Sequence, residues 1–205
     1  MKVKVLGIDG KATGREVVLS KDFFGIEPND HAIYLDVKQY LANQRQATHK
    51  AKERADIKGS TKKLRKQKGS GAARIGSVKS PLLRGGGRAF GPRSDRNYGF
   101  KLNKKLKTVA RKSALTYRAK ANEIIVIEDI ILDSPKTKGF MDIFKNIGAA
   151  DKAVYVSNEI DSNLFLSSKN VKSTRITEVS KLNTYDILNC KKLVFSESSL
   201  EYFKK

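Results

Sequence analysis

Residues 123–156 decide the fold class, and they read EIIVIEDIILDSPKTKGFMDIFKNIGAADKAVYV. Two short apolar runs, residues 124–127 and 153–156, are rich in β-branched side chains and are predicted to be buried strands. Between them, apolar residues from Phe140 to Ile147 recur at the spacing of one helix face. A strand–helix–strand unit of this kind favours a parallel sheet covered by helices.

The same alternation continues toward the C-terminus. We predict a helix near residues 163–168, a strand at 173–178, a helix at 185–190, a strand at 193–195 and then a terminal helix. Repeated strand–helix units strengthen the prediction of a mainly parallel sheet.

The N-terminal residues complete this domain. The first 19 residues are predicted to form a hairpin, and Asn29 or Asp30 is placed to cap the helix that follows. A further helix is predicted after Asn103, with an apolar stripe made of Leu106, Val109, Ala110, Ala114 and Tyr117. Residues 1–43 and 97–205 are therefore predicted to form one three-layer α/β domain, with a mainly parallel sheet flanked by helices.

Between these two parts the pattern stops. Residues 44–96 contain 16 Lys and Arg, three Asp and Glu, and only seven large apolar residues. Such a segment cannot bury enough apolar surface to offset the entropy lost on ordering. We therefore predict a long, extended basic loop, inserted after the first helix and flexible in the free protein.

The charge of the chain is concentrated in this region. The whole chain has 42 basic and 21 acidic residues, a net charge of +21, and residues 44–112 alone hold 22 basic and three acidic residues. A carrier of small acidic molecules needs only a few cations. This density instead indicates a polyanionic partner, with nucleic acid ahead of an anionic membrane surface.

Composition also indicates the compartment. No run of 18 apolar residues predicts a transmembrane helix, and the first residues lack the apolar stretch of a signal peptide. The single cysteine, Cys190, permits no intrachain disulfide and fits a reducing compartment. We expect a cytoplasmic protein without a membrane partner.

Two windows of the basic segment look suited to binding. In residues 65–77, RKQKGSGAARIGS, glycines let the backbone approach a phosphate or base closely, beside the cations. Residues 84–93 repeat this formula and add Phe90, which either stacks on an unpaired base or packs against the parent domain. Tyr98 and Phe100 are predicted to be core residues.

The sequence offers no pattern for catalysis, a metal or a cofactor. It contains no nucleotide-binding glycine motif of the form GxxxxGK[ST], and His31, His49 and Cys190 have no ligand or nucleophile–base spacing. The acids Glu128, Asp129 and Asp133 follow a predicted strand, but acids are common there without chemistry. We predict a protein that is not an enzyme and has no cofactor and no metal.

A family resemblance appears in the basic segment and continues beyond it. The matching residues are, in order, Thr48-His49-Lys50, residues 65–74, Gly76-Ser77-Val78-Lys79-Ser80-Pro81, Arg84-Gly85-Gly86-Gly87, Phe90-Gly91-Pro92, Lys104-Lys105, Ser113-Ala114-Leu115, Pro135-Lys136-Thr137-Lys138 and Asn163-Leu164-Phe165-Leu166. With this set, which covers almost the whole length, the chain resembles the bacterial large-subunit ribosomal protein L4 family.

The resemblance implies a structural constituent of the large ribosomal subunit. It implies early binding to 23S ribosomal RNA, contacts with several RNA domains, and a loop that lines part of the nascent-polypeptide exit tunnel. Neighbouring large-subunit proteins at the tunnel, and the nascent peptide in passing, would be further partners. The tip motif of the family falls on Gln67, Lys68, Gly69, Ser70, Gly71 and Arg74.

Two departures from the family concern the tip. Members often have Pro-Trp-Arg before the Gln-Lys-Gly motif, whereas this chain has Leu64-Arg65-Lys66 and no tryptophan. An Arg is usual where Ala72 stands. Both departures bear on the local packing of the tip rather than on the family.

The RNA-binding residues that we predict are the cations of the basic segment, one histidine and two lysines of the next helix. They are Arg45, His49, Lys50, Lys52, Arg54, Lys58, Lys62, Lys63, Arg65, Lys66, Lys68, Arg74, Lys79, Arg84, Arg88, Arg93, Arg96, Lys104 and Lys105. A non-ribosomal protein that compacts or shapes nucleic acid shares the charge argument and stays open as the alternative. An RNA-modifying enzyme would need a cofactor loop that the sequence lacks.

Overall fold

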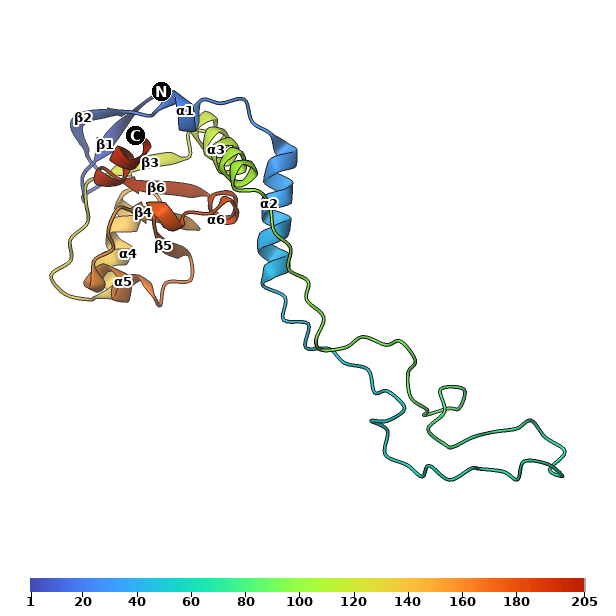
Figure 1. The fold of residues 1–205 in the computed structure, drawn as a ribbon. Helices are drawn as coiled ribbons and strands as arrows, with labels where there is room; N and C mark the ends of the chain where they lie inside the picture. The colour runs from blue at the N-terminus through green and yellow to red at the C-terminus, as the bar shows by residue number, and fades with distance from the viewer. Residues whose placement is uncertain (205) are drawn as a thin grey trace. The chain divides into compact units, whose positions relative to one another are not determined.

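The structure is a computed structural model that describes residues 1–204 (Figure 1). The chain divides into two compact units. The first combines Met1–Leu41 with Lys101–Lys205, and the second is Ala42–Phe100.

The first unit is built on a six-stranded sheet with the strand order β2-β1-β3-β6-β4-β5. The strands are β1 (Lys2–Leu6), β2 (Ala12–Val18), β3 (Ile124–Ile127), β4 (Ala153–Ser157), β5 (Thr174–Glu178) and β6 (Lys192–Ser196). Only the β1–β2 hairpin is antiparallel; the other four pairings are parallel. The predicted hairpin and the mainly parallel sheet are thus confirmed.

Within residues 1–204, six α-helices and two short 3₁₀ helices accompany the strands. They are α1 (Lys21–Phe24), α2 (Asp30–Asn43), α3 (Lys104–Lys120), α4 (Thr137–Asn146), α5 (Ser162–Ser168), α6 (Thr184–Asn189), η1 (Val179–Lys181) and η2 (Ser198–Lys204). The short helix α1 was not predicted, so the basic segment follows the second helix and not the first. The predicted terminal helix is the 3₁₀ helix η2.

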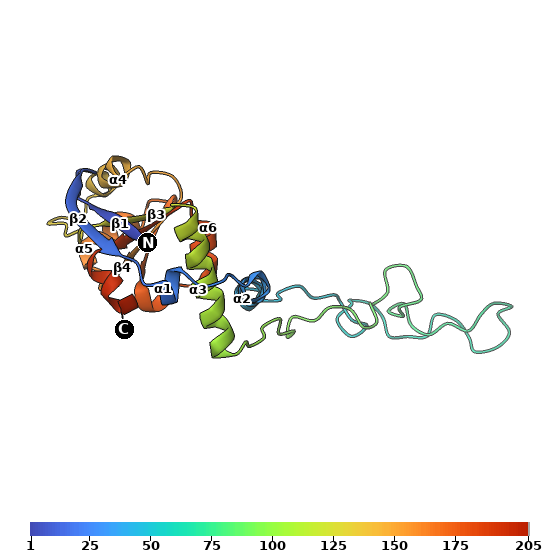
Figure 2. The same ribbon diagram turned by 90° about the horizontal axis from the view of Figure 1, so that it is seen from above.

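Alternate residues of the strands point to opposite faces of the sheet and fill two cores. In β4, Val154 and Val156 belong to a core with residues of α1, α3, α6 and η2, whereas Tyr155 belongs to a core with residues of α4 and α5. In β6, Phe195 and Val194 divide in the same way. Figure 2 shows α3 and α4 on opposite sides of the strands. The three-layer α/β class is therefore confirmed.

The buried face of α3 only partly matches the predicted stripe. Ala110 and Ala114 are fully buried, as predicted, but Val109 and Tyr117 are 40% and 41% exposed, and the fully buried Leu115 was not in the predicted stripe. The Tyr117 hydroxyl instead donates a hydrogen bond of 2.6 Å to Asp30 Oδ1 on α2. Most of the buried side chains of α3 are small, so its core face carries less apolar bulk than the predicted stripe.

The helix starts were predicted with mixed success. Asn29 caps α2, because its Oδ1 accepts a hydrogen bond of 2.9 Å from the Ala32 N–H. Asn103 precedes α3 as predicted, but its side chain makes no capping hydrogen bond. In α4, Lys136 occupies the cap position and Thr137 is already helical.

Candidate nucleic-acid interface

The second unit, which we call the arm, has no strand, and no helix beyond the final residues of α2. We divide it into an outgoing limb (residues 42–64), a tip (65–75) and a return limb (76–100). Backbone hydrogen bonds connect the limbs: the Ala51 N–H donates to the Pro92 carbonyl at 3.0 Å, and the Leu64 N–H donates to the Gly76 carbonyl at 3.0 Å. We call these isolated backbone hydrogen bonds between the limbs rungs. They hold two irregular segments together without forming a sheet.

Tyr98 organises one end of the arm. The Arg45 and Arg96 guanidinium carbons lie 3.9 Å and 4.8 Å from the centre of its ring. The Tyr98 hydroxyl is also 3.1 Å from His49 Nε2, within hydrogen-bond distance. The prediction that Tyr98 is a core residue was wrong: it is a partly exposed ring between cations, a favourable cation–π arrangement.

The middle of the arm is closed by a close backbone approach. A Cβ on Gly87 would lie 2.5 Å from the Arg54 backbone nitrogen, so only glycine lets the limbs come this close. Next to it, the Arg88 N–H donates to the Lys52 carbonyl at 2.9 Å. Ser77 is buried here, 3.5 Å from an Arg54 guanidinium nitrogen.

Two ion pairs use the acids of this region. Lys50 pairs with Asp56 at 3.0 Å, and Arg93 pairs with Glu53 at 2.7 Å. The Lys50 hydrogen bond, helped by the Glu53 backbone N–H, holds the pKa of Asp56 below its ordinary value. The Lys50–Asp56 pair lies within the outgoing limb, whereas the Arg93–Glu53 pair joins the two limbs. Most of the arm's cations have no carboxylate partner in the described chain.

The predicted RNA-binding residues are accessible. Except for Lys79, which is partly buried, all of them are exposed. Most lie along the two limbs and the tip, whereas Lys104 and Lys105 occupy the first turn of α3 in the other unit. The arm therefore presents a row of cations, with paired acids confined to its middle, which suits a polyanion that runs along it.

The tip makes few contacts of its own. Its residues are exposed apart from Ile75, and Lys63 of the outgoing limb donates a hydrogen bond to Gln67. Gly69 and Gly71 have φ values of +80° and +62°, in the left-handed region that favours glycine. A Cβ at either position would meet no atom within 4 Å, so their requirement is conformational and not steric.

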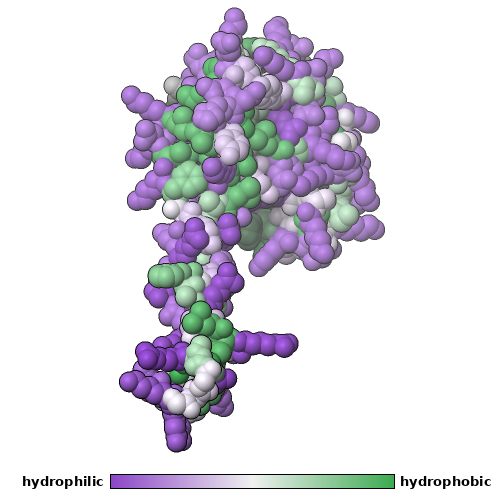
Figure 3. Space-filling model, turned by 90° about the vertical axis from the view of Figure 1, so that its right-hand side faces the viewer, coloured by the Kyte–Doolittle hydropathy of each residue, from purple (hydrophilic) through white to green (hydrophobic). Residues whose placement is uncertain are grey.

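Apolar side chains also reach the surface of the arm. Leu82 is 94% exposed and Phe90 is fully exposed. The space-filling view shows apolar groups interrupting the hydrophilic surface of this unit (Figure 3). Phe90 was predicted either to stack on a base or to pack against the parent domain, and the structure shows that it does not pack against the domain.

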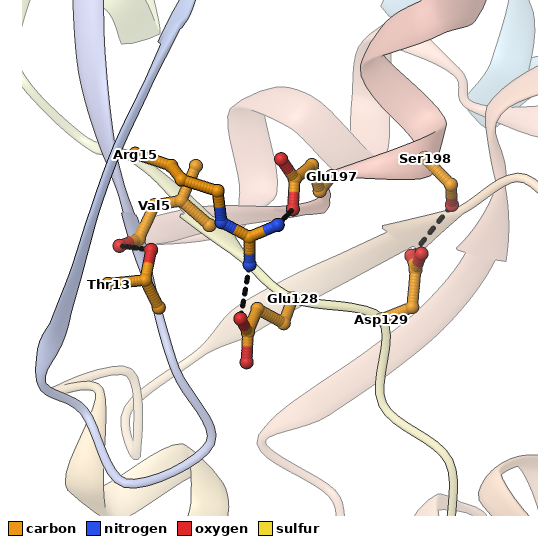
Figure 4. A network of polar contacts seen from close by, with 7 residues as sticks. All are labelled: Val5, Thr13, Arg15, Glu128, Asp129, Glu197 and Ser198. Carbon is orange, nitrogen blue, oxygen red and sulfur yellow. Dashed lines mark hydrogen bonds and ion pairs between the residues drawn. The ribbon is translucent and has the colours of Figure 1, made fainter.

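The acids after β3 have structural partners at the carboxyl edge of the sheet (Figure 4). Arg15 of β2 pairs with Glu128 and, at 3.0 Å, with Glu197. Asp129 accepts a hydrogen bond of 2.7 Å from the Ser198 hydroxyl. These pairs hold the hairpin and the start of η2 to the ends of β3 and β6, which accounts for acids at this position without catalysis.

Burial raises the pKa values of several groups in the first unit, among them Tyr155 and Cys190. Burial raises the pKa of Tyr155 to about 12, and burial likewise raises the pKa of the Cys190 thiol. Cys190 donates to the Ile187 carbonyl at 3.2 Å and is a core residue, as predicted. A protonated, buried thiol is a poor nucleophile.

Among residues 1–204, no three His, Cys, Asp or Glu side chains lie close enough together to bind a metal ion. Within the same residues, no helix combines the length and apolar character needed to cross a membrane.

Sequence reasoning missed the residues that join the limbs. Ala51, Pro92 and Gly87 carry no charge and no periodic pattern, and their role depends on a pairing between distant irregular segments. The only available signal was the triple glycine at residues 85–87, which marks a place where backbones can approach.

Comparison with known proteins now places the chain in a family. A family model described as the ribosomal protein L4/L1 family matches residues 17–205. The large ribosomal subunit protein uL4 of Christiangramia forsetii is 59% identical over 202 residues, which cover 98% of this chain and 97% of that relative. The proteins of the same name from Flavobacterium psychrophilum and Bacteroides fragilis are 56% and 54% identical, each over 98% of this chain and 96% and 97% of their own lengths. On this evidence the chain belongs to the ribosomal protein L4/L1 family, whose members are structural, non-enzymatic proteins of the large ribosomal subunit.

Proposed function

We propose that this chain is a cytoplasmic protein that binds 23S ribosomal RNA early in assembly of the large subunit, and that the arm supplies most of the binding. One observation carries the proposal: residues 44–96 hold 16 cations against three acids, and all but one of the predicted contact residues are exposed. Cations placed between RNA helices neutralise phosphates that would otherwise repel. Irregular limbs let these cations follow an irregular path.

Subunit association tests this proposal. Because the Ala51 nitrogen and the Pro92 oxygen are only 3.0 Å apart, a short glycine linker can replace residues 52–91. This variant loses 12 cations and two acids. In sucrose gradients the full chain should sediment with large subunits at moderate salt, and the variant should remain at the top. Equal sedimentation of the two proteins would contradict the proposal.

A competition binding experiment distinguishes this proposal from the alternative, a protein that compacts nucleic acid in general. At one salt concentration the full chain should prefer folded 23S ribosomal RNA to duplex DNA of equal nucleotide number. Equal affinity would favour a general architectural role, because phosphate contacts alone carry no sequence or shape information.

We further propose that the tip, Gln67, Lys68, Gly69, Ser70, Gly71 and Arg74, lines part of the exit tunnel beside neighbouring large-subunit proteins. The motif match and the exposure of these residues support this. A photo-crosslinker attached to Ser70→Cys should capture a stalled nascent chain, whereas the same group at Ser94→Cys should not. The buried Cys190 should remain unlabelled in both variants. Equal capture from both positions would contradict this placement.

A further inference from the structure

We propose that Phe90 is a stacking platform for an unpaired RNA base, and that backbone hydrogen bonds between the two limbs present its ring to the RNA. This inference rests on the proposed RNA-binding function and specifies what the arm recognises. The first observation is exposure: the relative accessibility of Phe90 is 108%, so the whole ring stands in water. An apolar ring left in water by its own fold has surface available to a partner.

The second observation is the backbone of Phe90. Its φ is +50°, in the left-handed region, which is a strained position for a bulky side chain. Strain of this kind persists only where the surroundings enforce it, and it concentrates at functional positions. In this conformation the ring does not pack against its own unit.

The surroundings that enforce the strain are two rungs between the limbs. Two residues before Phe90, the Arg88 N–H donates to the Lys52 carbonyl at 2.9 Å. Two residues after it, the Pro92 carbonyl accepts from the Ala51 N–H at 3.0 Å. Between these rungs, a Cβ on Gly91 would lie 2.7 Å from the Ala51 Cβ, so the limbs are in contact there. Phe90 is thus fixed on both sides while its side chain stays exposed.

The charge around Phe90 identifies the class of partner. From residue 57 to residue 94 the chain contains no acid, and Arg84, Arg88 and Arg93 lie within six residues of Phe90. An apolar pocket on another protein would need no such cationic setting, whereas a nucleic acid offers phosphates for the cations and a base for the ring. A base in a duplex already stacks on both neighbours, so the ring selects an unpaired one.

The chain offers a spectroscopic test. It contains no tryptophan, so Phe90→Trp introduces a single indole. The probes are two RNA hairpins of equal stem length, one with a three-nucleotide bulge and one fully paired. Indole fluorescence should be quenched by the bulged hairpin and should change little with the paired one, because stacking on a base quenches the ring.

Affinity provides the second readout. Phe90→Ala should weaken binding of the bulged hairpin by about 5-fold to about 100-fold and change binding of the paired hairpin less than about twofold, as expected for one lost base–aromatic stack. Phe90→Leu keeps apolar bulk without a ring and should weaken binding like Phe90→Ala. Leu82→Ala, which removes another exposed apolar group without an aromatic ring, should match the parent chain.

Each failure has a distinct meaning. If Phe90→Ala binds the bulged hairpin as tightly as the parent, or weakens both hairpins equally, the stacking platform is wrong while RNA binding by the arm stands. An unchanged Phe90→Trp spectrum also overturns the platform. If the parent chain binds neither hairpin at low salt, the proposed function fails and this inference fails with it.

Discussion

At the scale of single residues, the arm depends on glycines as much as on its charged side chains. The limbs approach most closely at Gly87, where a Cβ would lie 2.5 Å from the Arg54 backbone nitrogen. Backbone atoms at that distance cannot move aside as the end of a flexible side chain can. The cations gain their positions from this contact, although it carries no charge.

Gly87→Ala should therefore open the middle of the arm. An overpacked contact costs about 1–3 kcal/mol, so the Arg88 amide, which donates to Lys52, should exchange its hydrogen about 5 to 100 times faster. Hydrogen exchange followed by NMR measures this directly. Gly76→Ala is the matched control, because a Cβ there meets nothing within 4 Å. Equal exchange in the two variants would mean that the close approach does not hold the limbs.

Tyr155, also a single residue, makes the stability of the fold depend on pH. Burial raises its pKa to about 12 in the folded protein, against 10.0 as its ordinary value. The unfolded state therefore ionises first, and stability is lost as pH rises from about 10 to about 12. A difference of two pKa units corresponds to about 2.7 kcal/mol.

Urea unfolding at pH 9 and pH 11.5 measures this effect. The parent should lose more stability between the two pH values than Tyr155→Phe does, because the variant cannot ionise there. Comparing the variants as a difference removes the contribution of the lysines. An identical loss of stability in the parent and in Tyr155→Phe would show that folding does not raise the pKa of Tyr155.

At the scale of elements, α3 shows what periodicity can and cannot predict. The pattern placed the helix correctly and put the fully buried Ala114 on its core face, but it included Val109, which is 40% exposed, and left out the fully buried Leu115. Hydropathy weights large apolar residues, while close packing against a sheet also selects small ones. The position of the helix was therefore predictable, but its rotation about its axis was not.

Leu115→Ala and Val109→Ala distinguish the two faces. Removing the fully buried Leu115 side chain should cost about 2–5 kcal/mol, whereas Val109 is 40% exposed and its truncation should cost less than about 1 kcal/mol. Chemical denaturation of both variants, with an unchanged m-value, measures the difference. A larger loss for Val109→Ala would restore the face that the sequence pattern favoured.

Strand alternation accounts for how well the rest of the fold was predicted. The runs at residues 124–127 and 153–156 are short and continuously apolar because both faces of a parallel sheet are covered. The four-residue helix α1 was missed because so short a segment has no periodicity to detect. In the arm, residue type predicted which side chains are charged, but the rungs that join Ala51 to Pro92 depend on tertiary contact and left no local pattern.

At the scale of the whole molecule, the buried apolar cores and most of the excess positive charge lie in different parts of the chain. Among the described residues, neither core cluster contains a residue from 42–100. The arm has few large buried side chains, and its charge is almost all of one sign. We therefore expect the α/β unit to keep its fold without the arm, and we expect the proposed RNA binding to depend on the arm.

Replacing residues 52–91 by a glycine linker tests the first half of that division. The variant should unfold cooperatively, with a midpoint within a few degrees of the parent, because no core contact is removed. Calorimetry and circular dichroism measure this. An unfolded variant, or a midpoint more than about 10 °C lower, would mean that the arm is part of the cooperative fold.

The second half is tested most directly by the salt dependence of RNA binding. If about ten arm cations contact phosphates of a 23S ribosomal RNA fragment, the logarithm of the binding constant should fall against the logarithm of salt concentration with a slope of about −7 to −9. The variant without residues 52–91 should show a slope shallower than about −2, because it lacks 12 of the chain's cations. A slope shallower than about −2 for the full chain, or equal slopes for both proteins, would contradict the claim that the arm dominates binding.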